Sequence, residues 1–416
     1  MPKRTFSPAL FDTAQDISLG VPYDLVWEWG TGDQSPERAK ALLSNKTAQG
    51  TTVVSDSSGL TKLTAEKGII EILALIDIPK RLIYSYGTAI GGVGIGVWAA
   101  DNTQMWYPPS VAPAHIASML LELQKVLVKE SVIKIGFGMH TGSFYEIGGG
   151  LAGPEAELIE EIAENVSAGG EILVTESTSK LLGRGSTFVF EEKENAPDHV
   201  GRVLRLARGP ESQVSLGTIT DRYPIPYSID FHTDLVEYGR DFARDHEQLL
   251  ETKYTQEKVV LLVERTRDDS PSTEEQLLSD LALSVVVAGT GRKLMSETIQ
   301  EIKIAGALAI YVADDAQELF RFAKNLSIAL AREGISLRMG MTQGSVLIFD
   351  LPRGSRDIAG APVNVASKMA QDEGSFGSLY VASNVTRLIP EEQGAAISFG
   401  VSGTTIDAVR FRLETM

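Results

Sequence analysis

Four polar side chains stand at positions from which they could bind a charged ligand. Asp56 ends an apolar segment and precedes the small residues 57–59, and Lys303 lies in a second apolar segment. Asn364 and Lys368 are one helical turn apart. Carboxylate oxygens suit hard divalent cations, and a lysine can offset the charge of a phosphate. Equally, an aspartate at such a place can cap a turn, and the other three side chains can be solvated or face a domain interface.

Other kinds of chemistry have weaker support. The chain has no cysteine, which excludes disulfides, thiolate metal sites and cysteine nucleophiles. The glycine run 148–150 lacks the Lys-Ser/Thr of a phosphate-binding P-loop. Residues 91–96 lack the long helix of a dinucleotide-binding fold, so both glycine-rich segments predict hairpin turns. His140 has no histidine cluster near it, and we expect it to be a core histidine.

The charge balance excludes one large class of partner. Among 416 residues, 38 Lys and Arg stand against 55 Asp and Glu, for a net charge of −17. Nucleic acid would be repelled, since no basic patch is visible in the sequence. The most apolar windows, 68–78 and 89–100, are shorter than the roughly 20 residues that span a bilayer. The sequence therefore predicts a soluble, cytoplasmic protein without a membrane span or a nucleic-acid partner.

The elements that must position the polar side chains fall into four segments. Residues 1–48 form a leader in which Ser35 and Pro36 predict the N-cap and the first residue of a short helix. Residues 49–207 and 258–416 each alternate between strand-like and helical patterns, which predicts two domains.

Residues 208–257 are expected to connect the two domains. Pro224 and Pro226 forbid a continuous helix in the first half of this connection. A charged, helix-prone stretch from Asp234 to Leu250 follows. We therefore expect a connection with one helix.

An internal repeat relates the two domains. Residues 134–142 align with 337–344, and each segment is followed by a glycine that opens a helical stretch. A second glycine closes that stretch at the same spacing in both copies, and a strand-like segment follows directly. The opening and closing glycines are Gly153 and Gly170 in the first copy and Gly360 and Gly377 in the second. Shared order at equal spacing is strong evidence for a duplicated domain.

The repeated segments resemble the class III adenylate/guanylate cyclase homology domain. Residues 52–61 match its apolar strand that ends in Asp and a small-residue turn. Residues 93–98 and 303–308 match its hairpin, and 360–368 match its helix beginning Gly-Asp-x-x-Asn-x-x-x-Arg. The resemblance implies an α+β fold, with two ferredoxin-like βαββαβ domains forming an intramolecular pseudo-heterodimer. It also implies that each site lies in a groove between the two domains.

In one groove the resemblance gives roles to the polar side chains. Asp56 takes the first of two metal-binding carboxylate positions, and the aliphatic Ile95 takes the second. Asn364 takes the ribose-orienting position, and Lys368 replaces an arginine, which keeps the charge but loses the bidentate fork. The remaining cofactor-binding assignments are Ser57 and Gly59 for phosphate, and Lys303 for adenine with Ala361 in place of its Asp partner.

In the other groove the resemblance predicts no nucleotide binding. Glu264 and Ala307 occupy the two metal positions. Glu157 and Glu161 occupy the Asn and Arg positions, where two carboxylates would repel a triphosphate, and Pro154 replaces the base-reading Asp.

These departures lead to a first hypothesis of a catalytically impaired, cyclase-like pseudoenzyme. It would act in signalling by binding a nucleotide or a protein partner, with Mg²⁺ or Mn²⁺ accompanying a nucleoside triphosphate. The alternatives are an active adenylate or guanylate cyclase, which recruits Mn²⁺ or a neighbouring carboxylate to an atypical metal site, and an interaction module that binds no nucleotide.

Overall fold

The computed structural model describes most of the chain and divides it into two compact units. The described residues are 23–58, 63, 67–98, 101–147, 149–183, 187–212, 214–217, 222–266, 272–350, 356–371, 374–389, 394–401 and 404–413. We call Ser44–Gln248 the N-unit, and Leu249–Met416 together with Met1–Leu43 the C-unit. Each unit is described by itself.

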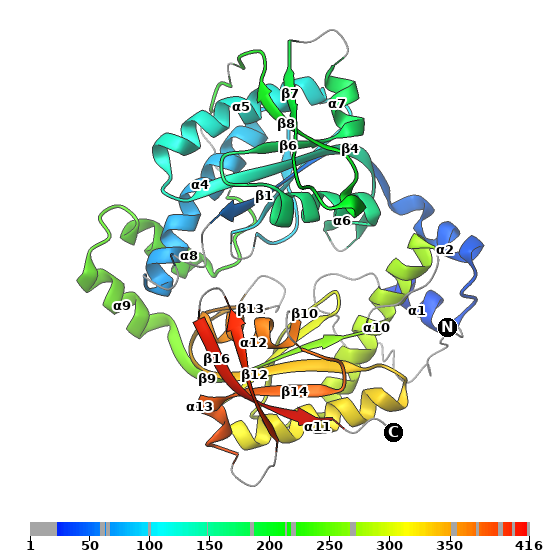
Figure 1. The fold of residues 1–416 in the computed structure, drawn as a ribbon, viewed down its shortest axis with the longest axis vertical. Coiled ribbons are helices and arrows are strands. Elements are labelled where there is room, and N and C mark those ends of the chain that lie inside the picture. Colours follow the sequence, from blue (N-terminus) through cyan, green and yellow to red (C-terminus); the bar gives the residue numbers. More distant parts are fainter. Residues whose placement is uncertain are drawn as a thin grey trace. The chain divides into compact units, whose positions relative to one another are not determined.

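The N-unit is built on a mixed sheet of eight strands (Figure 1). Its strand order is β2-β3-β1-β4-β6-β8-β7, and β5 pairs with β4. The central strand β1 is antiparallel to both β3 and β4, whereas β4 and β6 are parallel. The strands are β1 Thr47–Ser58, β2 Val93–Gly94, β3 Thr103–Tyr107, β4 Lys134–Ile147, β5 Gly150–Ala152, β6 Ile172–Thr175, β7 Val189–Glu192 and β8 Val203–Arg208.

Helices cover both faces of this sheet, which is why the middle of β1 reads as a continuous buried run. Val53 points into a core formed with α4 and α5, and Val54 points into a second core formed with α6 and the π-helical turn after it. A strand covered on both faces has no solvent side on which to place polar residues. The helices are α4 Ile69–Ala89, α5 Pro113–Glu130, α6 Pro154–Glu161, the turn Ile162–Val166, and α7 Glu176–Leu182.

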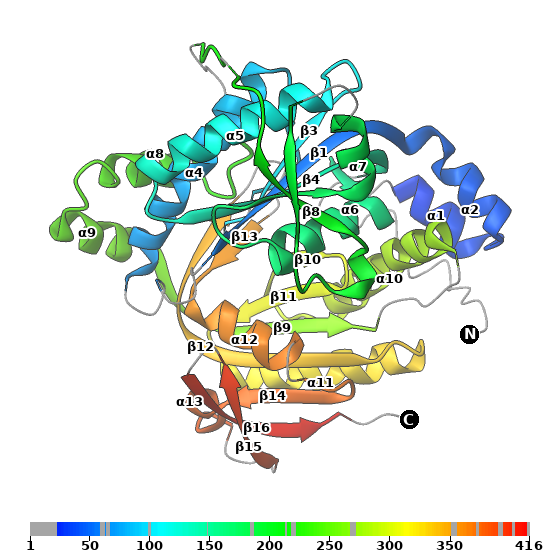
Figure 2. The same ribbon diagram turned by 45° about the horizontal axis from the view of Figure 1, so that its top comes forward.

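The C-unit repeats this sheet strand for strand (Figure 2). Its order is β10-β11-β9-β12-β14-β16-β15, with β13 paired to β12. The sequence prediction of two α+β domains is therefore confirmed. The strands are β9 Thr255–Arg265, β10 Gln300–Ala305, β11 Leu308–Ala313, β12 Leu337–Asp350, β13 Arg356–Ala359, β14 Ser378–Ala382, β15 Ala395–Val401 and β16 Thr404–Arg412.

The glycines that revealed the repeat open the same helix in each unit. Gly153 precedes α6 with φ +100°, and Gly360 precedes α12 with φ +145°. A side chain is strained at such angles, so glycine is needed at both places. The helices of the C-unit sheet are α10 Thr273–Leu294, α11 Ala316–Arg332, α12 Ala361–Gln371 and α13 Ser383–Thr386.

The described part of the leader packs on the C-unit. It forms α1 (Tyr23–Thr31) and α2 (Pro36–Leu43), and both contact α10. Trp29 is 2% exposed, and its Nε1 donates to Ser279 Oγ at 3.1 Å. The predicted cap of α2 is present, since the Arg38 N–H donates to Ser35 Oγ at 3.3 Å. A 3₁₀ turn, Ser44–Lys46, precedes β1.

The connection holds two helices where the sequence suggested one helix-prone stretch. They are α8 (Ile229–Tyr238) and α9 (Arg244–Tyr254). Phe242 between them has φ +52°, and the side chain of Asp241 accepts the N–H of Ala243. This turn breaks the helical hydrogen bonding. A further short turn, Asp198–Val200, precedes β8. Within the described residues, no helix combines the length and apolarity that crossing a membrane requires.

Candidate functional site

The structure places a second carboxylate beside Asp56. Ser55 of β1 pairs with Thr103 of β3, and their hydroxyl groups lie 2.6 Å apart. Two residues before Thr103 the chain reaches Asp101, whose Oδ2 accepts a hydrogen bond from Ser57 Oγ. Asp101 also lies close enough to Asp56 to raise the pKa of its carboxyl group, through charge and through hydrogen bonding. We call Asp56, Ser57 and Asp101 the carboxylate half-site.

The electrostatics of this half-site favour a positive ligand. Burial, reinforced by the charge of Asp101, raises the pKa of Asp56 to about 7, although the Ser57 N–H opposes the shift. Glu164 adds to the negative potential. Burial also raises the pKa of Glu164, against the effect of a 2.7 Å hydrogen bond donated by Asn102 Nδ2. Two adjacent carboxyl groups cannot both ionise cheaply, and a cation between them would remove that cost.

The donor set fits a magnesium or manganese ion that shares its coordination with a ligand. Among the described residues, no group of three or more His, Cys, Asp or Glu side chains is arranged to hold a metal. Mg²⁺, however, is usually held by one or two carboxylates together with water and substrate phosphates. Asp56 and Asp101 provide that set.

Asp101, and not Ile95, therefore stands in the second carboxylate position. In the C-unit, Glu264 pairs with Leu308, and the Arg265 N–H donates to the Ala307 carbonyl. In the N-unit, Ser55 pairs with Thr103, and continuing this antiparallel register by two residues brings Ser57 opposite Asp101. Asp101 is thus the counterpart of Ala307. Our sequence alignment of the second position needs this correction.

Ile95 lies in the same hairpin tip but on the side of β2, whereas Asp101 lies on the side of β3. Its N–H donates to the Gln104 carbonyl at 3.0 Å, which places it at the end of β2. The hairpin tip of the N-unit, residues 95–102, is longer than that of the C-unit, where only Gly306 and Ala307 separate the strands. The sequence alignment matched Gly94 with Gly306 and therefore Ile95 with Ala307. It thus placed the extra residues of the N-unit tip after the second carboxylate position, whereas by register they precede Asp101.

In the C-unit, two arginines lie in the region that corresponds to the carboxylate half-site. Arg338 Nη2 lies 2.7 Å from Oε2 of Glu264, the residue in register with Asp56. Arg265, in register with Ser57, is 1% exposed. Its guanidinium donates to the Asp280 side chain at 2.8 Å and to the Gly306 carbonyl at 3.3 Å. The C-unit counterpart of the site is therefore neutralised by its own side chains.

The C-unit supplies a different polar pair. Lys303 on β10 lies with its Nζ 3.2 Å from Oδ1 of Asp357 on β13. Asp357 is 6% exposed and also accepts the N–H of Ile358 at 2.9 Å. The sequence analysis placed Ala361 in the position of the Lys303 partner. The structure instead places Ala361 at the start of α12 and makes Asp357 the partner. We call Lys303 and Asp357 the lysine–aspartate half-site.

The two remaining predicted residues of the C-unit share one face of α12. Asn364 is exposed and Lys368 is partly exposed, and their spacing of four residues places them on one face of the helix. The opposite face carries the buried residues Pro362, Ala366, Met369 and Ala370. Ser57 is found in the carboxylate half-site, whereas Gly59 lies outside the described residues.

The N-unit helix α6 presents glutamates at the corresponding positions. Glu157 is exposed, and Glu161 accepts a hydrogen bond from Asn165 Nδ2 at 2.7 Å. His140 is 5% exposed, with its Nδ1 2.8 Å from Thr175 Oγ1 and its Nε2 3.5 Å from Glu155. Burial lowers the pKa of His140 despite that carboxylate. As expected, it is a core histidine.

Comparison with known proteins gives matches among solved structures alone. No protein-family model and no curated protein matches the chain. The chain is similar to a class III adenylyl cyclase-like ATP-binding protein from Pseudomonas aeruginosa, with 13% identity and a TM-score of 0.49 over 82% of this chain and 85% of that one.

Shorter matches cover single catalytic domains. The adenylyl cyclase CyaB from P. aeruginosa has 18% identity and a TM-score of 0.33 over 39% of this chain and 97% of its own. An adenylate/guanylate cyclase/hydrolase from Silicibacter pomeroyi has 19% identity and a TM-score of 0.30 over 38% of this chain and 96% of its own. These three similar structures are all of cyclase or cyclase-like proteins.

Proposed function

We propose that this protein binds ATP together with Mg²⁺ or Mn²⁺, and that it acts in signalling mainly through this binding, with slow conversion to a cyclic nucleotide. The observation that carries the proposal is that Asp101, which the Ser57 hydroxyl holds by a hydrogen bond, lies beside Asp56. It supplies the pair of hard oxygen ligands of which the sequence alignment had found only Asp56.

The lysine–aspartate half-site supports adenine as the base. Adenine presents a ring nitrogen that accepts and an adjacent amino group that donates. The Lys303 ammonium is a donor and the Asp357 carboxylate is an acceptor, so the pair matches that edge. In the same orientation guanine presents the reverse pattern, which neither group of the protein matches. The family resemblance gives Lys303 the role of reading adenine.

The chemistry in question is in-line attack of the ribose 3′-hydroxyl on the α-phosphate, with pyrophosphate leaving. A bound divalent cation supplies charge neutralisation at the phosphate oxygens. Asp56 and Asp101 would hold that charge, and Ser57 orients Asp101. Asn364 and Lys368 take the ribose and phosphate roles that the resemblance gives them.

Lys368 is the reason to propose slow turnover. An arginine there would offer two parallel N–H donors to phosphate oxygens, whereas a lysine is a single point charge. The change weakens stabilisation of the transition state more than binding of the ground state, so it lowers the rate of conversion.

A second candidate function is a fully active cyclase. Asp101 favours it specifically, since it restores the neighbouring carboxylate that an active cyclase needs. The rate of cyclic AMP formation with Mg²⁺ and with Mn²⁺ separates the two candidates. A rate equal to that of competent cyclases would select the second.

The binding proposal is tested by calorimetry with ATP and GTP, each with Mg²⁺ and with EDTA. We expect metal-dependent binding of ATP in preference to GTP. Asp101→Asn should weaken the metal-dependent binding at least tenfold, because one of two anionic ligands becomes neutral. Ile95→Asn is the matched control in the same hairpin and should bind as the unmodified protein does.

Two outcomes would contradict the proposal. Equal affinity for ATP with and without metal would remove the role of the carboxylate half-site. No thermal stabilisation by any nucleotide would select the interaction-module alternative, since binding at 100 times the dissociation constant adds about 2.7 kcal/mol.

A further inference from the structure

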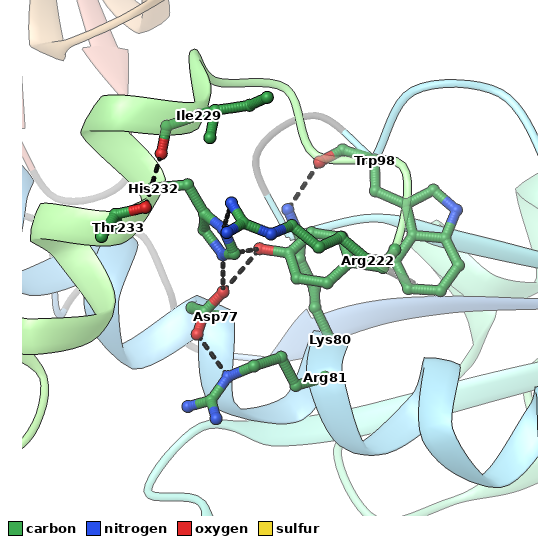
Figure 3. A network of polar contacts seen from close by, with 9 residues as sticks. Asp77, Lys80, Arg81, Trp98, Arg222, Ile229, His232 and Thr233 are labelled. Atoms are coloured by element: carbon green, nitrogen blue, oxygen red, sulfur yellow. Dashed lines mark hydrogen bonds and ion pairs between the residues drawn. The ribbon is translucent and has the colours of Figure 1, made fainter. Parts of the chain in front are cut away.

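A buried lysine fastens the long hairpin tip of the N-unit to helix α4. Lys80 is 1% exposed, and its Nζ donates to the backbone carbonyl of Trp98 at 2.6 Å (Figure 3). Trp98 lies between Ile95 and Asp101 in the tip. An ammonium group is costly to bury, and an apolar residue would fill the same space without that cost. A buried ammonium group needs polar partners, and the Trp98 carbonyl is one of them.

Trp98 is held from three further directions. Its backbone N–H donates to the Pro224 carbonyl of the connection at 3.0 Å. Its indole stacks on the ring of Tyr223 with centroids 5.5 Å apart and planes 18° apart. Its indole N–H lies 3.1 Å from the Ile95 carbonyl and 3.2 Å from the Gln104 carbonyl, inside the hairpin.

Tyr223 is itself fixed to α4. Its hydroxyl donates to Asp77 Oδ1 at 2.6 Å, and His232 Nε2 of α8 lies 2.8 Å from the same oxygen. Lys80 lies one helical turn after Asp77, 5.9 Å from the Tyr223 ring centroid. Helix α4, the connection and the hairpin tip thus form one buried polar network (Figure 3).

The C-unit shows what this network adds. Its hairpin turns directly through Gly306 and Ala307, and no carboxylate stands there. The longer tip of the N-unit carries Asp101 and includes the residue that the network holds. Fixing Trp98 in one position costs conformational entropy, and the contacts of the network offset that cost.

We propose that Lys80 is a positioning residue for the carboxylate half-site, because it fixes the Trp98 carbonyl and thereby holds the hairpin tip where Asp101 meets Asp56. The competing explanation is that β3 alone places Asp101 through the Ser55–Thr103 pair. The Mn²⁺-binding tests of this inference rest on the proposed function, whereas the metal-free test does not.

The test compares Lys80→Met with Arg81→Met on the same helix. Arg81 contacts Asp77 but is half-exposed and has no hydrogen bond to the hairpin among the described contacts. The free Mn²⁺ signal in electron paramagnetic resonance reports metal affinity. We expect Lys80→Met to weaken Mn²⁺ binding about tenfold, as the loss of an outer supporting contact does in metal sites. Arg81→Met should leave it unchanged.

A double variant shows whether Lys80 acts through Asp101. If it does, Asp101→Asn with Lys80→Met should bind Mn²⁺ as weakly as Asp101→Asn alone. Equal losses from Lys80→Met in both backgrounds would overturn the proposal, as would full Mn²⁺ affinity in Lys80→Met.

A metal-free readout separates this inference from the proposed function. The ¹³C signal of the Asp101 carboxyl carbon, recorded at one pH without metal, reports its contact with Ser57 and Asp56. Lys80→Met should shift that signal and Arg81→Met should not. An unmodified protein that binds no Mn²⁺ refutes the metal site alone. An unshifted Asp101 signal in Lys80→Met refutes the positioning role.

Discussion

Asp56 is the residue whose ionisation should govern cation binding. Its pKa is raised to about 7 by burial and by Asp101, and only the deprotonated carboxylate can bind a metal. Mn²⁺ affinity should therefore be constant above pH 8 and fall about tenfold for each pH unit below 7. A titration of Mn²⁺ affinity from pH 5.5 to 8.5 measures this. A flat profile would show that Asp56 is not a ligand.

The raised pKa of Asp56 also predicts that the free energy of unfolding falls as the pH rises, whereas Mn²⁺ affinity increases. The native pKa of Asp56 lies above its unfolded value of about 3.9, so the folded state binds the proton more tightly. Stability is then lost as pH rises from about 4 to 7 and stays low above. Asp56→Asn should raise the free energy of unfolding by about 1 kcal/mol at pH 8, after allowing for solvent screening. Chemical denaturation at pH 5 and pH 8 checks the difference.

Lys368 is the residue to change if turnover is to be raised. Lys368→Arg restores the planar fork at the position where the resemblance expects it. We expect cyclic nucleotide formation to increase about tenfold, which corresponds to about 1.4 kcal/mol in the activation barrier. Lys324→Arg on α11 is the control for a general effect of arginine. An unchanged rate in Lys368→Arg would remove the explanation for slow turnover.

At the scale of elements, the junction of α4 with α8 should be acid-sensitive. Burial raises the pKa of Asp77, but hydrogen bonds from His232 and Tyr223 and the charge of Arg81 more than offset this and hold it below its usual range. A lowered native pKa adds stability above the unfolded value of about 3.9, and that stability is lost as pH falls through the native pKa.

Asp77→Asn should therefore destabilise the N-unit at pH 7 by about 3 kcal/mol, since it leaves buried partners of the carboxylate unmatched. The difference from the unmodified protein should shrink below pH 4. Thermal melts of both proteins from pH 3 to 7 test this. A difference independent of pH would mean that the effect is one of packing and not of charge.

The sequence predicted elements well where local chemistry decides them. Ser35 and Pro36 place the start of α2, and Gly153 and Gly360 place α6 and α12, because each position has a backbone requirement that few residues meet. The glycine spacing also revealed two equivalent α+β domains, and the identical strand orders bear this out.

Contacts between residues on different strands could not be predicted in this way, because they depend on how the strands pair. The hairpin that carries Asp101 has more residues between its strands than the C-unit hairpin that carries Ala307. A single sequence does not show on which side of Asp101 the extra residues lie. Asp357 reaches Lys303 because β13 folds back beside β10, which no local pattern indicates. In both cases the candidate carboxylate was visible in the sequence, but the strand register was needed to place it.

At the scale of the whole molecule, the leader contributes to the stability of the C-unit. Trp29 is buried against α10 and hydrogen-bonded to Ser279. Trp29→Ala should lower the free energy of unfolding of the C-unit by about 3 kcal/mol. Trp27→Ala, on the same helix but only partly buried, is the matched control and should cost less. Denaturant titration of both variants decides it, and equal losses would contradict the packing argument.

The arginines of the C-unit have a consequence for how the two copies respond to their surroundings. In the C-unit, Arg338 of the chain itself balances the charge of Glu264, whereas in the N-unit the proposed divalent cation would balance Asp56. A chelator should thus alter the melting of the N-unit and leave that of the C-unit unchanged. Under the proposed function, the two copies of one fold thus differ in that divalent cations stabilise the N-unit alone.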